Sequence, residues 1–207
     1  LGIAVQAYSK QAMPILGWLS FLANEADTVI PVRLVKGAYW DTEIKLAQQT
    51  GLPDYPVYTL KQATDLSYQL CSNFMLSKHC PYLAPQFATH NAMPISHLLQ
   101  QPTADLPATT LEFQRLHGMG EALYQHVLNE HPDVVLRVYA PVGAQQQLLP
   151  YLVRRLLENG ANSSFVLQQF NLQISPEQIC CQPENGLRQY PELRNQAIPL
   201  PADIYPP

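Results

Sequence analysis

Short apolar runs that end in polar or glycine-containing segments recur through the first two thirds of the chain. Five such runs begin at Ile3, Ile30, Pro85, Leu111 and Val134. Helix-like patterns lie between and after them, at residues 11–23, 41–49, 60–77, 95–99, 121–128 and 149–158. Buried strands that alternate with helices predict an α/β fold with a parallel sheet covered by helices.

The number of strand–helix units bears on the architecture. Five units are about five eighths of a (β/α)8 barrel, which needs eight strands and about 250 residues. The sequence starts at Leu1 without an initiator Met, so the other strands are expected upstream, in a longer protein. A doubly wound open sheet is the alternative, although no G-x-G-x-x-G motif follows a strand.

The character of the sequence changes after Val166. Prolines are dense and helical periodicity fades from Leu167 to Pro207, as in extended linkers. We therefore predict a barrel portion at residues 1–166, followed by a linker at residues 167–207.

Composition excludes some classes of function. The 207 residues carry a net charge of −4, and only 14% of them are charged. No basic stripe indicates nucleic acid. The longest apolar stretch, Pro14–Ala23, is about half of the roughly 20 residues that a membrane-spanning helix needs. It predicts a buried helix instead, and no signal peptide is expected before it.

The sequence contains few signals of metal binding or of functional cysteines. Cys71, Cys80, Cys180 and Cys181 match no metal-binding or disulfide spacing, which favours reduced structural cysteines in the cytosol. The six histidines form no H-x3-H pair, so no metal site is expected. A nucleophile elbow and a Walker loop are also absent from the sequence.

Two adjacent arginines interrupt the leucine-rich helix pattern "YLVRRLLENG". We expect Pro150 in the first turn of this helix and Gly160 at its end. The expected apolar stripe is Leu149, Val153, Leu156 and Leu157. Arg154 and Arg155 can converge on one carboxylate or phosphate. The alternative is a solvated Arg154–Glu158 pair one turn apart.

Polar residues also gather where the predicted strands end. "RLVKGAYW" offers the charges of Arg33 and Lys36, the aromatic rings of Tyr39 and Trp40, and a glycine that permits close approach of a ligand. An ordinary glycine turn with two core aromatic residues is the alternative. The other polar strand ends are "ATHN", with a histidine that is more often structural than catalytic, "FQRLHGMG", with Gln114, Arg115 and His117, and "QAYSK", with Gln6. Ends that face one rim favour a binding site.

Taken together, these motifs resemble one family. "QAYSK", "RLVKGAYW", "YPVYT", "PQFATHNA", "EFQRLHGMG", "VYAPVG" and "LLPYLVRRLLENGANSSFV" are similar to the proline dehydrogenase domain of the bifunctional proline utilization A flavoproteins. The tail "RNQAIPLPADIYPP" is similar to the linker that leads into the aldehyde dehydrogenase domain of those proteins.

The resemblance implies the C-terminal portion of a distorted (β/α)8 barrel that holds FAD. It implies a bacterial enzyme of proline catabolism that oxidises L-proline to pyrroline-5-carboxylate and passes the electrons to a membrane quinone. It further implies a cytoplasmic protein that associates peripherally with the inner face of the membrane, with an aldehyde dehydrogenase domain in the same polypeptide.

The resemblance also implies residue roles. Arg154 and Arg155 would bind the proline carboxylate and Glu158 would orient them, while Tyr139, Tyr39 and Leu116 would enclose the pyrrolidine ring. The implied FAD contacts are Gln6, Arg33, Val35, Gly37, Ala38, Trp40, Thr59, Thr89, His90, Asn91 and Gln114.

The sequence departs from the family pattern in places, and other interpretations stay open. The family's substrate-binding lysine and a nearby acidic residue would lie upstream of Leu1, and a usually basic position is Leu60 here. An inactive truncated fragment that serves as an interaction module is one alternative, because an incomplete barrel leaves strand edges unpaired. On the main interpretation too, residues 1–207 alone are expected to be inactive. A barrel enzyme for phosphorylated sugars is the other alternative.

Overall fold

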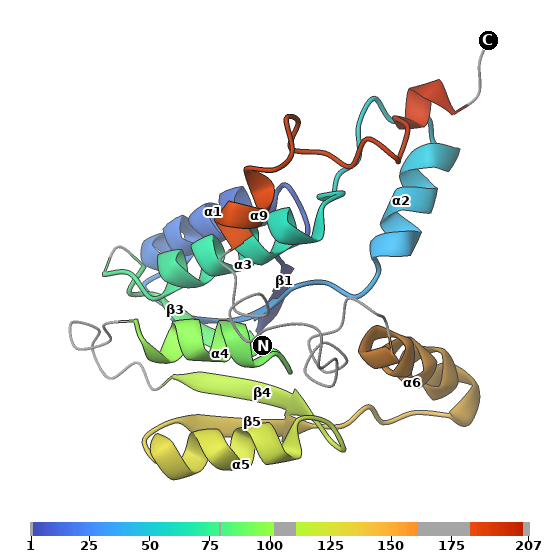
Figure 1. Ribbon diagram of the computed structural model, residues 1–207. Coiled ribbons are helices and arrows are strands. Elements are labelled where there is room, and N and C mark those ends of the chain that lie inside the picture. The colour runs from blue at the N-terminus through green and yellow to red at the C-terminus, as the bar shows by residue number, and fades with distance from the viewer. Residues whose placement is uncertain (1, 79, 102–110, 161–182, 205–207) are drawn as a thin grey trace. The chain divides into compact units, whose positions relative to one another are not determined.

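A computed structural model describes residues 2–78, 80–101, 111–160 and 183–204 of the chain (Figure 1). It divides into two compact units. The first comprises Leu1–Phe87, Gln101–Thr109 and Gln182–Pro207, and the second comprises Ala88–Gln100 and Thr110–Cys181.

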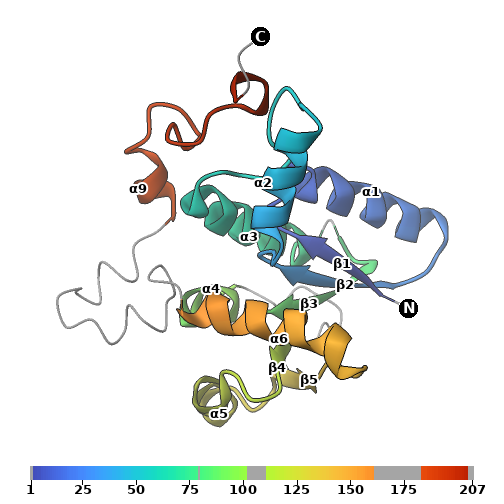
Figure 2. The ribbon, with the colours of Figure 1, turned by 90° about the vertical axis from the view of Figure 1, so that its right-hand side faces the viewer.

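The strands of the first unit are parallel and pair in chain order. They are β1 (Ile3–Gln6), β2 (Ile30–Val35) and β3 (Leu83–Ala88), and the registers run from Ile3 opposite Val32 and from Val32 opposite Pro85. Helices α1 (Ala12–Glu25), α2 (Trp40–Gln49) and α3 (Lys61–Met75) connect them. Figure 2 shows the three strands side by side. The predicted strands and helices of this unit are confirmed to within a few residues.

Alternating burial along the strands forms the core of the first unit. Val32 and Leu34 of β2 are fully buried, and so is Phe87 of β3. Arg33 and Val35 lie at the intervening positions and are half-buried, because successive side chains of a strand point to opposite faces. One face of β2 therefore belongs to the core, and the other carries the candidate site residues.

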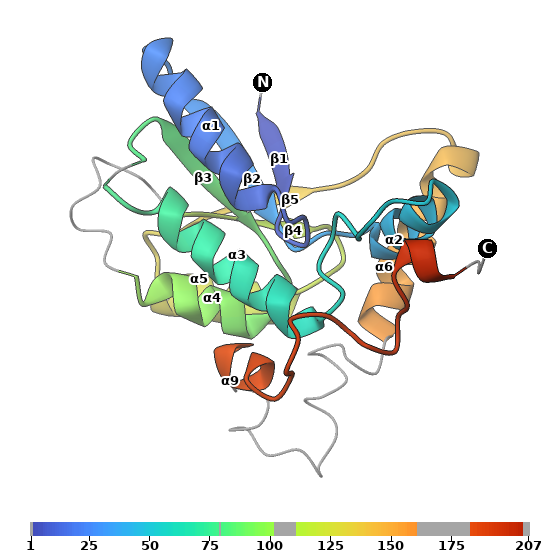
Figure 3. The same ribbon diagram turned by 90° about the horizontal axis from the view of Figure 1, so that it is seen from above.

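The prediction of a buried helix at Pro14–Ala23 holds for one side of the helix only. Helix α1 packs beside α3 (Figure 3) and buries only the stripe Ala12, Leu16, Leu19 and Ala23. Trp18 and Phe21 remain 60% and 62% exposed. The apolar run extends around the whole helix, but a helix packed on one side buries one stripe only. Within the described ranges, no helix is long and apolar enough to span a membrane.

The second unit contains a parallel strand pair. Strand β4 (Glu112–Leu116) pairs with β5 (Val135–Tyr139) from Glu112 opposite Val135 to Leu116 opposite Tyr139. Its helices are α4 (Ala92–Leu99), α5 (Glu121–Glu130) and α6 (Gln145–Gly160). Phe113 and Tyr124 are fully buried, with their ring centroids 6.0 Å apart.

Helix α6 differs from its prediction in two respects. It begins at Gln145, so Pro150 lies inside the helix rather than in its first turn. The residues before Pro150 include three glutamines, which are good helix formers and extend the helix backwards. In addition, Leu149 and Val153 of the expected apolar stripe are 56% and 42% exposed. The side chains of Leu156 and Leu157 lie outside the described residues.

The chain's C-terminal part returns to the first unit. Within the predicted linker, residues 167–182 lie outside the described residues. Helix α9 (Pro183–Leu187) packs against α3, and the 3-10 helix η1 (Pro201–Asp203) packs against α2. Pro183, Leu187 and Pro201 are buried, so this part of the segment has packing contacts of its own.

An ion-pair cluster ties the end of β2 to α3. The Asp65 carboxylate accepts hydrogen bonds from the ammonium groups of Lys36 and Lys61. Burial alone raises the pKa of Asp65, but the two lysines outweigh it and hold that pKa below its usual value. The ammonium group of Lys36, a candidate positive charge in the sequence, is thus paired with Asp65 in the structure.

Replacing Asp65 with Asn should lower the free energy of unfolding at neutral pH by about 1–3 kcal/mol, because a largely buried charged hydrogen bond is lost. The wild-type contribution exists above the carboxyl's unfolded pKa and is lost as the pH falls below it. Urea denaturation at pH 7 measures the effect. Asp133→Asn, at an exposed loop position, is the control, and an equal effect of both changes would contradict the prediction.

Candidate functional site

The segment after β2 is held by backbone hydrogen bonds and by one ring. Ala7 N–H and Tyr8 N–H donate to the carbonyls of Val35 and Lys36, both at 2.8 Å. Gly37 has a φ of 129°, and a Cβ there would lie 2.6 Å from Cγ of the Tyr8 ring. The close approach that the sequence predicted at this glycine is therefore made by Tyr8 of the chain itself.

Tyr8 was not identified from the sequence, although "QAYSK" contains it. It is 4% exposed, and its hydroxyl donates to Glu43 Oε1 at 3.5 Å. Burial, and then the Glu43 carboxylate, raise the pKa of Tyr8 to about 12. Gln6 lies nearby at the end of β1, opposite Val35, and is half-buried. Tyr8 therefore stays a neutral hydrogen-bond donor beside the candidate residues Gln6 and Gly37.

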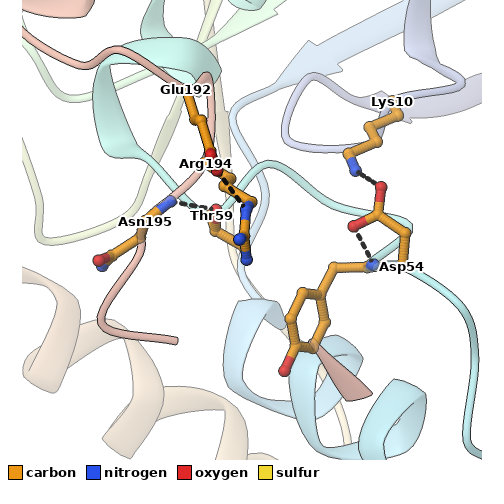
Figure 4. Close-up of polar contacts among 7 residues, drawn as sticks. Lys10, Asp54, Thr59, Glu192, Arg194 and Asn195 are labelled. Atoms are coloured by element: carbon orange, nitrogen blue, oxygen red, sulfur yellow. Dashed lines mark hydrogen bonds and ion pairs between the residues drawn. The ribbon is translucent and has the colours of Figure 1, made fainter. Parts of the chain in front are cut away.

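The aromatic pair of "RLVKGAYW" lies at the start of α2. Tyr39 is 43% exposed. The Trp40 indole is half-buried and donates through Nε1 to the carbonyl of Tyr58 at 2.8 Å. Thr59 follows in the chain, and its Oγ1 accepts the backbone N–H of Asn195 at 2.9 Å (Figure 4). The structure therefore links Trp40 and Thr59 through one loop, a link that the sequence does not reveal.

Leu60 has a packing role in this chain. It is 4% exposed and packs in a cluster with Ala63 and with Leu187 of α9. The apolar side chain of Leu60 is thus covered by α9.

The "ATHN" residues are held by structural hydrogen bonds in the second unit. Thr89 Oγ1 accepts the N–H of Asn91 at 3.2 Å, and the Thr89 carbonyl accepts the Tyr124 hydroxyl at 2.8 Å. Asn91 caps α4 by accepting the N–H of Met93 at 2.9 Å, as asparagine does at helix starts. These contacts are those of a structural strand end, the alternative left open above for this histidine motif.

His90 is fixed in one tautomer. Its Nε2 accepts the backbone N–H of Leu116 at 3.0 Å, so the neutral ring carries its proton on Nδ1. Burial, and then the positive charges of Arg155 and Arg115, lower the pKa of His90 to about 4. At neutral pH the ring is uncharged, and Nδ1–H is a hydrogen-bond donor.

The next strand ends lie against His90. Leu116 is buried and pairs with Tyr139 across the β4–β5 ladder. Beyond them, His117 N–H donates to the Tyr139 carbonyl at 2.8 Å. Hydrogen bonds therefore place His90, Leu116 and Tyr139 together at one end of the second unit.

Gln114 lies earlier in β4 and is only 6% exposed. Its side-chain amide donates to Glu112 Oε1 at 2.7 Å. The Glu112 carboxylate also receives Arg137 in a two-pronged contact of 2.9 and 3.1 Å. The side-chain NH2 group of Gln114 thus donates one hydrogen bond within β4.

The paired arginines are half-buried on α6. The Arg155 guanidinium lies over the Tyr151 ring, 5.1 Å from its centroid, a cation–π geometry. Tyr151 was not identified as functional, although its spacing of four residues from Arg155 places both on one helix face. The Glu158 side chain lies outside the described residues, so its pairing with the arginines stays a prediction.

The candidate residues thus form two sets. Gln6, Arg33, Val35, Gly37, Ala38, Tyr39, Trp40 and Thr59 belong to the first unit, and Thr89, His90, Asn91, Gln114, Leu116, Tyr139, Arg154 and Arg155 belong to the second. A search of the described part of the chain finds no group of three metal-binding side chains.

Comparison with known proteins identifies the family. Residues 1–168 match the family model "Proline dehydrogenase". The chain belongs to the proline dehydrogenase family. Bifunctional protein PutA of Klebsiella aerogenes is 43% identical over 99% of the chain, which spans 16% of that relative.

Solved structures agree with this membership. A mutant of Bradyrhizobium japonicum proline utilization A superposes on the whole chain with a TM-score of 0.88 and 47% identity, over 21% of that protein. Another proline utilization A structure, described with proline bound in remote sites, has a TM-score of 0.87, also at 47% identity and over 21% of its chain. The predicted α/β fold, a portion of a (β/α)8-type barrel, is confirmed by this likeness. The chain spans about a fifth of these proteins.

Gly37→Ala should destabilise the first unit by more than Gly51→Ala does. Both glycines have a positive φ, but a Cβ meets the Tyr8 ring only at Gly37 and open space at Gly51. Strain of the backbone alone costs about 1–3 kcal/mol, and the buried ring adds to it at position 37. Urea denaturation of both variants measures the difference, and equal losses would show that Tyr8 does not require the glycine.

His90 should make stability depend on pH. Its folded pKa of about 4 lies below the ordinary 6.5, so the unfolded chain binds more protons between these values. The free energy of unfolding should therefore fall as the pH drops from 6.5 towards 4, and fall less in His90→Gln. Urea denaturation at several pH values tests this. His117→Gln, at an exposed histidine, should keep the wild-type slope, and a wild-type slope in His90→Gln would refute the prediction.

Proposed function

We propose that this chain is part of an FAD-dependent proline dehydrogenase that oxidises L-proline to pyrroline-5-carboxylate, the first step of proline catabolism to glutamate. The observation that carries the proposal is the family match over residues 1–168. The geometry of both units is consistent with it, because each offers polar or aromatic groups next to strand ends, where barrel enzymes bind their ligands.

In this proposal Arg154 and Arg155 bind the proline carboxylate. Adjacent guanidiniums suit the two oxygens of a carboxylate. The Tyr151 ring under Arg155 restricts that side chain, so less conformational freedom is lost when the substrate binds. Glu158 would orient the arginines further.

The pyrrolidine ring would lie against Leu116, Tyr139 and Tyr39. Leu116 is held by the hydrogen bond from its N–H to His90, and Tyr139 by the β4–β5 ladder. Fixed apolar walls orient the substrate Cα and exclude water, which favours the reaction by positioning.

The family is flavin-dependent, and the residues present fit a flavin dinucleotide. Neutral His90 presents an Nδ1–H donor, Arg33 lies on the half-exposed face of β2, and the Trp40 ring offers a stacking surface. When bound, the flavin supplies the two-electron oxidation. We assign FAD contacts to Gln6, Arg33, Val35, Gly37, Ala38, Trp40, Thr59, Thr89, His90, Asn91 and Gln114.

The partners follow from the same proposal. Electrons would pass to a membrane quinone, from a cytoplasmic protein associated peripherally with the membrane. The word "bifunctional" in the name of the Klebsiella relative supports a second activity in the same polypeptide. In this proposal that activity is an aldehyde dehydrogenase domain, and residues 167–207 would lead towards it.

Arg154→Met and Arg155→Met, made in the native full-length protein, should each raise the KM for proline by about 10- to 150-fold, since a charge-assisted hydrogen bond contributes about 1.5–3 kcal/mol. Steady-state assays with an artificial quinone measure this. Arg188→Met removes an exposed arginine and should leave the KM unchanged. An unchanged KM in either test variant removes that arginine from the carboxylate site.

Melting temperatures of the same proteins, measured with and without ligand, distinguish the proposed function from the alternative of an enzyme for phosphorylated sugars. The proline analogue tetrahydrofuroic acid should stabilise the wild type and not the arginine variants. Stabilisation by inorganic phosphate instead would favour an enzyme for phosphorylated sugars.

A further inference from the structure

Residues 192–200, called the C-terminal segment below, lie against the loop of residues 53–60 in the first unit (Figures 1 and 4). The middle of this loop is held by the chain's own N-terminal part: Tyr58 N–H donates to the Tyr8 carbonyl at 2.8 Å, and Lys10 N–H to the Pro56 carbonyl at 3.0 Å. The two flanks of the loop, Tyr55 and Thr59, are held by the C-terminal segment.

The first contact is made by Thr59. Its Oγ1 accepts the backbone N–H of Asn195, 136 residues away, at 2.9 Å. Asn195 is itself fixed, because its side chain accepts the N–H of Ala197 at 3.0 Å. A hydroxyl that accepts one hydrogen bond still has a proton to donate, so Asn195 orients the donor of Thr59.

The second contact is made by Tyr55, which is 3% exposed. Its hydroxyl donates to the Pro199 carbonyl at 2.8 Å and accepts from Gln48 Nε2 at 2.9 Å. One buried hydroxyl therefore joins α2, the loop and the C-terminal segment. Removing this hydroxyl would break the hydrogen bonds to both Pro199 and Gln48 and so weaken the link between these three parts.

The third contact is apolar. Ile198 and Trp40 both pack against the buried cluster of Tyr8, Ile44, Ala47, Tyr55 and Val57. The Trp40 indole also donates to Tyr58 of the same loop at 2.8 Å. The position of the Trp40 ring thus depends on a cluster and a loop that the C-terminal segment holds.

The other polar contact of the loop is weaker. Asp54 pairs with Lys10 at 2.6 Å, but both side chains are well exposed, and exposed pairs contribute at most about 1 kcal/mol. The partly buried contacts to the C-terminal segment are therefore the stronger side-chain restraint on the loop.

We propose that the C-terminal segment is a positioning element for the Trp40–Thr59 side of the dinucleotide site, so that cofactor affinity depends on the docked segment. The inference rests on the proposed function, because Trp40 and Thr59 are assigned there to FAD. Asn195, Ile198 and Pro199 act through Thr59, Trp40 and Tyr55 and touch no substrate themselves.

Two test variants and two matched controls in the native full-length protein examine this. Tyr55→Phe removes the buried hydroxyl and should raise the FAD dissociation constant about 2- to 12-fold, the range for one hydrogen bond. Ile198→Ala should raise it as well. Tyr190→Phe and Ile15→Ala make the same changes at side chains that are 39% and 40% exposed and lie outside the C-terminal segment, and they should leave it unchanged. Isothermal titration of the apoprotein gives the constants.

A readout without cofactor follows Trp40 itself. In protein labelled with 5-fluorotryptophan, the Trp40 fluorine resonance is the one missing from Trp40→Phe. The Trp40 resonance should change its chemical shift or narrow in Tyr55→Phe and Ile198→Ala. The resonance of Trp18, which lies on the exposed face of α1, should keep its chemical shift and linewidth. The mild Tyr55→Phe change keeps the test valid if Ile198→Ala fails to fold.

The proposal requires both results, the loss of FAD affinity and the change of the Trp40 resonance. If the Trp40 resonance moves without a loss of FAD affinity, or affinity falls while the resonance stays, the positioning role is refuted. If the wild-type apoprotein binds no FAD at all, the proposed function fails, and the resonance alone still decides whether the C-terminal segment holds Trp40.

Discussion

The first unit depends on the contact between the Tyr8 ring and the backbone at Gly37. The segment after β2 stays paired with residues 7 and 8 through two backbone hydrogen bonds, which press it against a ring that leaves no room for a Cβ. Because Tyr8 also belongs to the cluster that supports Tyr55, Val57 and Trp40, this contact sets where α2 starts and where the loop before α3 lies. The positions of the candidate residues before and after Gly37 therefore depend on this contact.

The second unit achieves the same fixation with hydrogen bonds instead of a steric contact. Thr89, His90 and Asn91 each bond to a neighbouring backbone group, so the polar residues of this strand end hold the structure that would present them. A structural role and a ligand-binding role are compatible here, because each group has more than one hydrogen-bonding atom. His90 shows this clearly: Nε2 is used inside the protein, and Nδ1–H remains as a donor.

Local pattern predicted the five strands and most helices, because burial imposes a period of two on strands and 3.6 on helices. It failed where a local rule was ambiguous. Pro150 suits a first helical turn, yet the glutamines before it extend α6. An apolar run such as Pro14–Ala23 does not show which side of its helix other elements will cover. The candidate site residues at strand ends could be proposed from the sequence, but their hydrogen-bond partners could not. The bonds from Asn195 to Thr59 and from Tyr55 to Pro199 join positions 136 and 144 residues apart, and neither has a periodic signature.

The surroundings of His90 also explain why its ring is neutral. Burial opposes a positive charge on the ring most strongly, and the guanidiniums of Arg155 and Arg115 add to this effect. A neutral ring accepts the Leu116 N–H on Nε2, whereas a protonated ring would have no acceptor to offer and would release that strand end. Arg155, proposed to bind a carboxylate, therefore also helps burial to keep His90 in the one form that fixes Leu116. The positive charge of Arg155 and the fixed backbone of Leu116 are thus both next to one buried, neutral histidine.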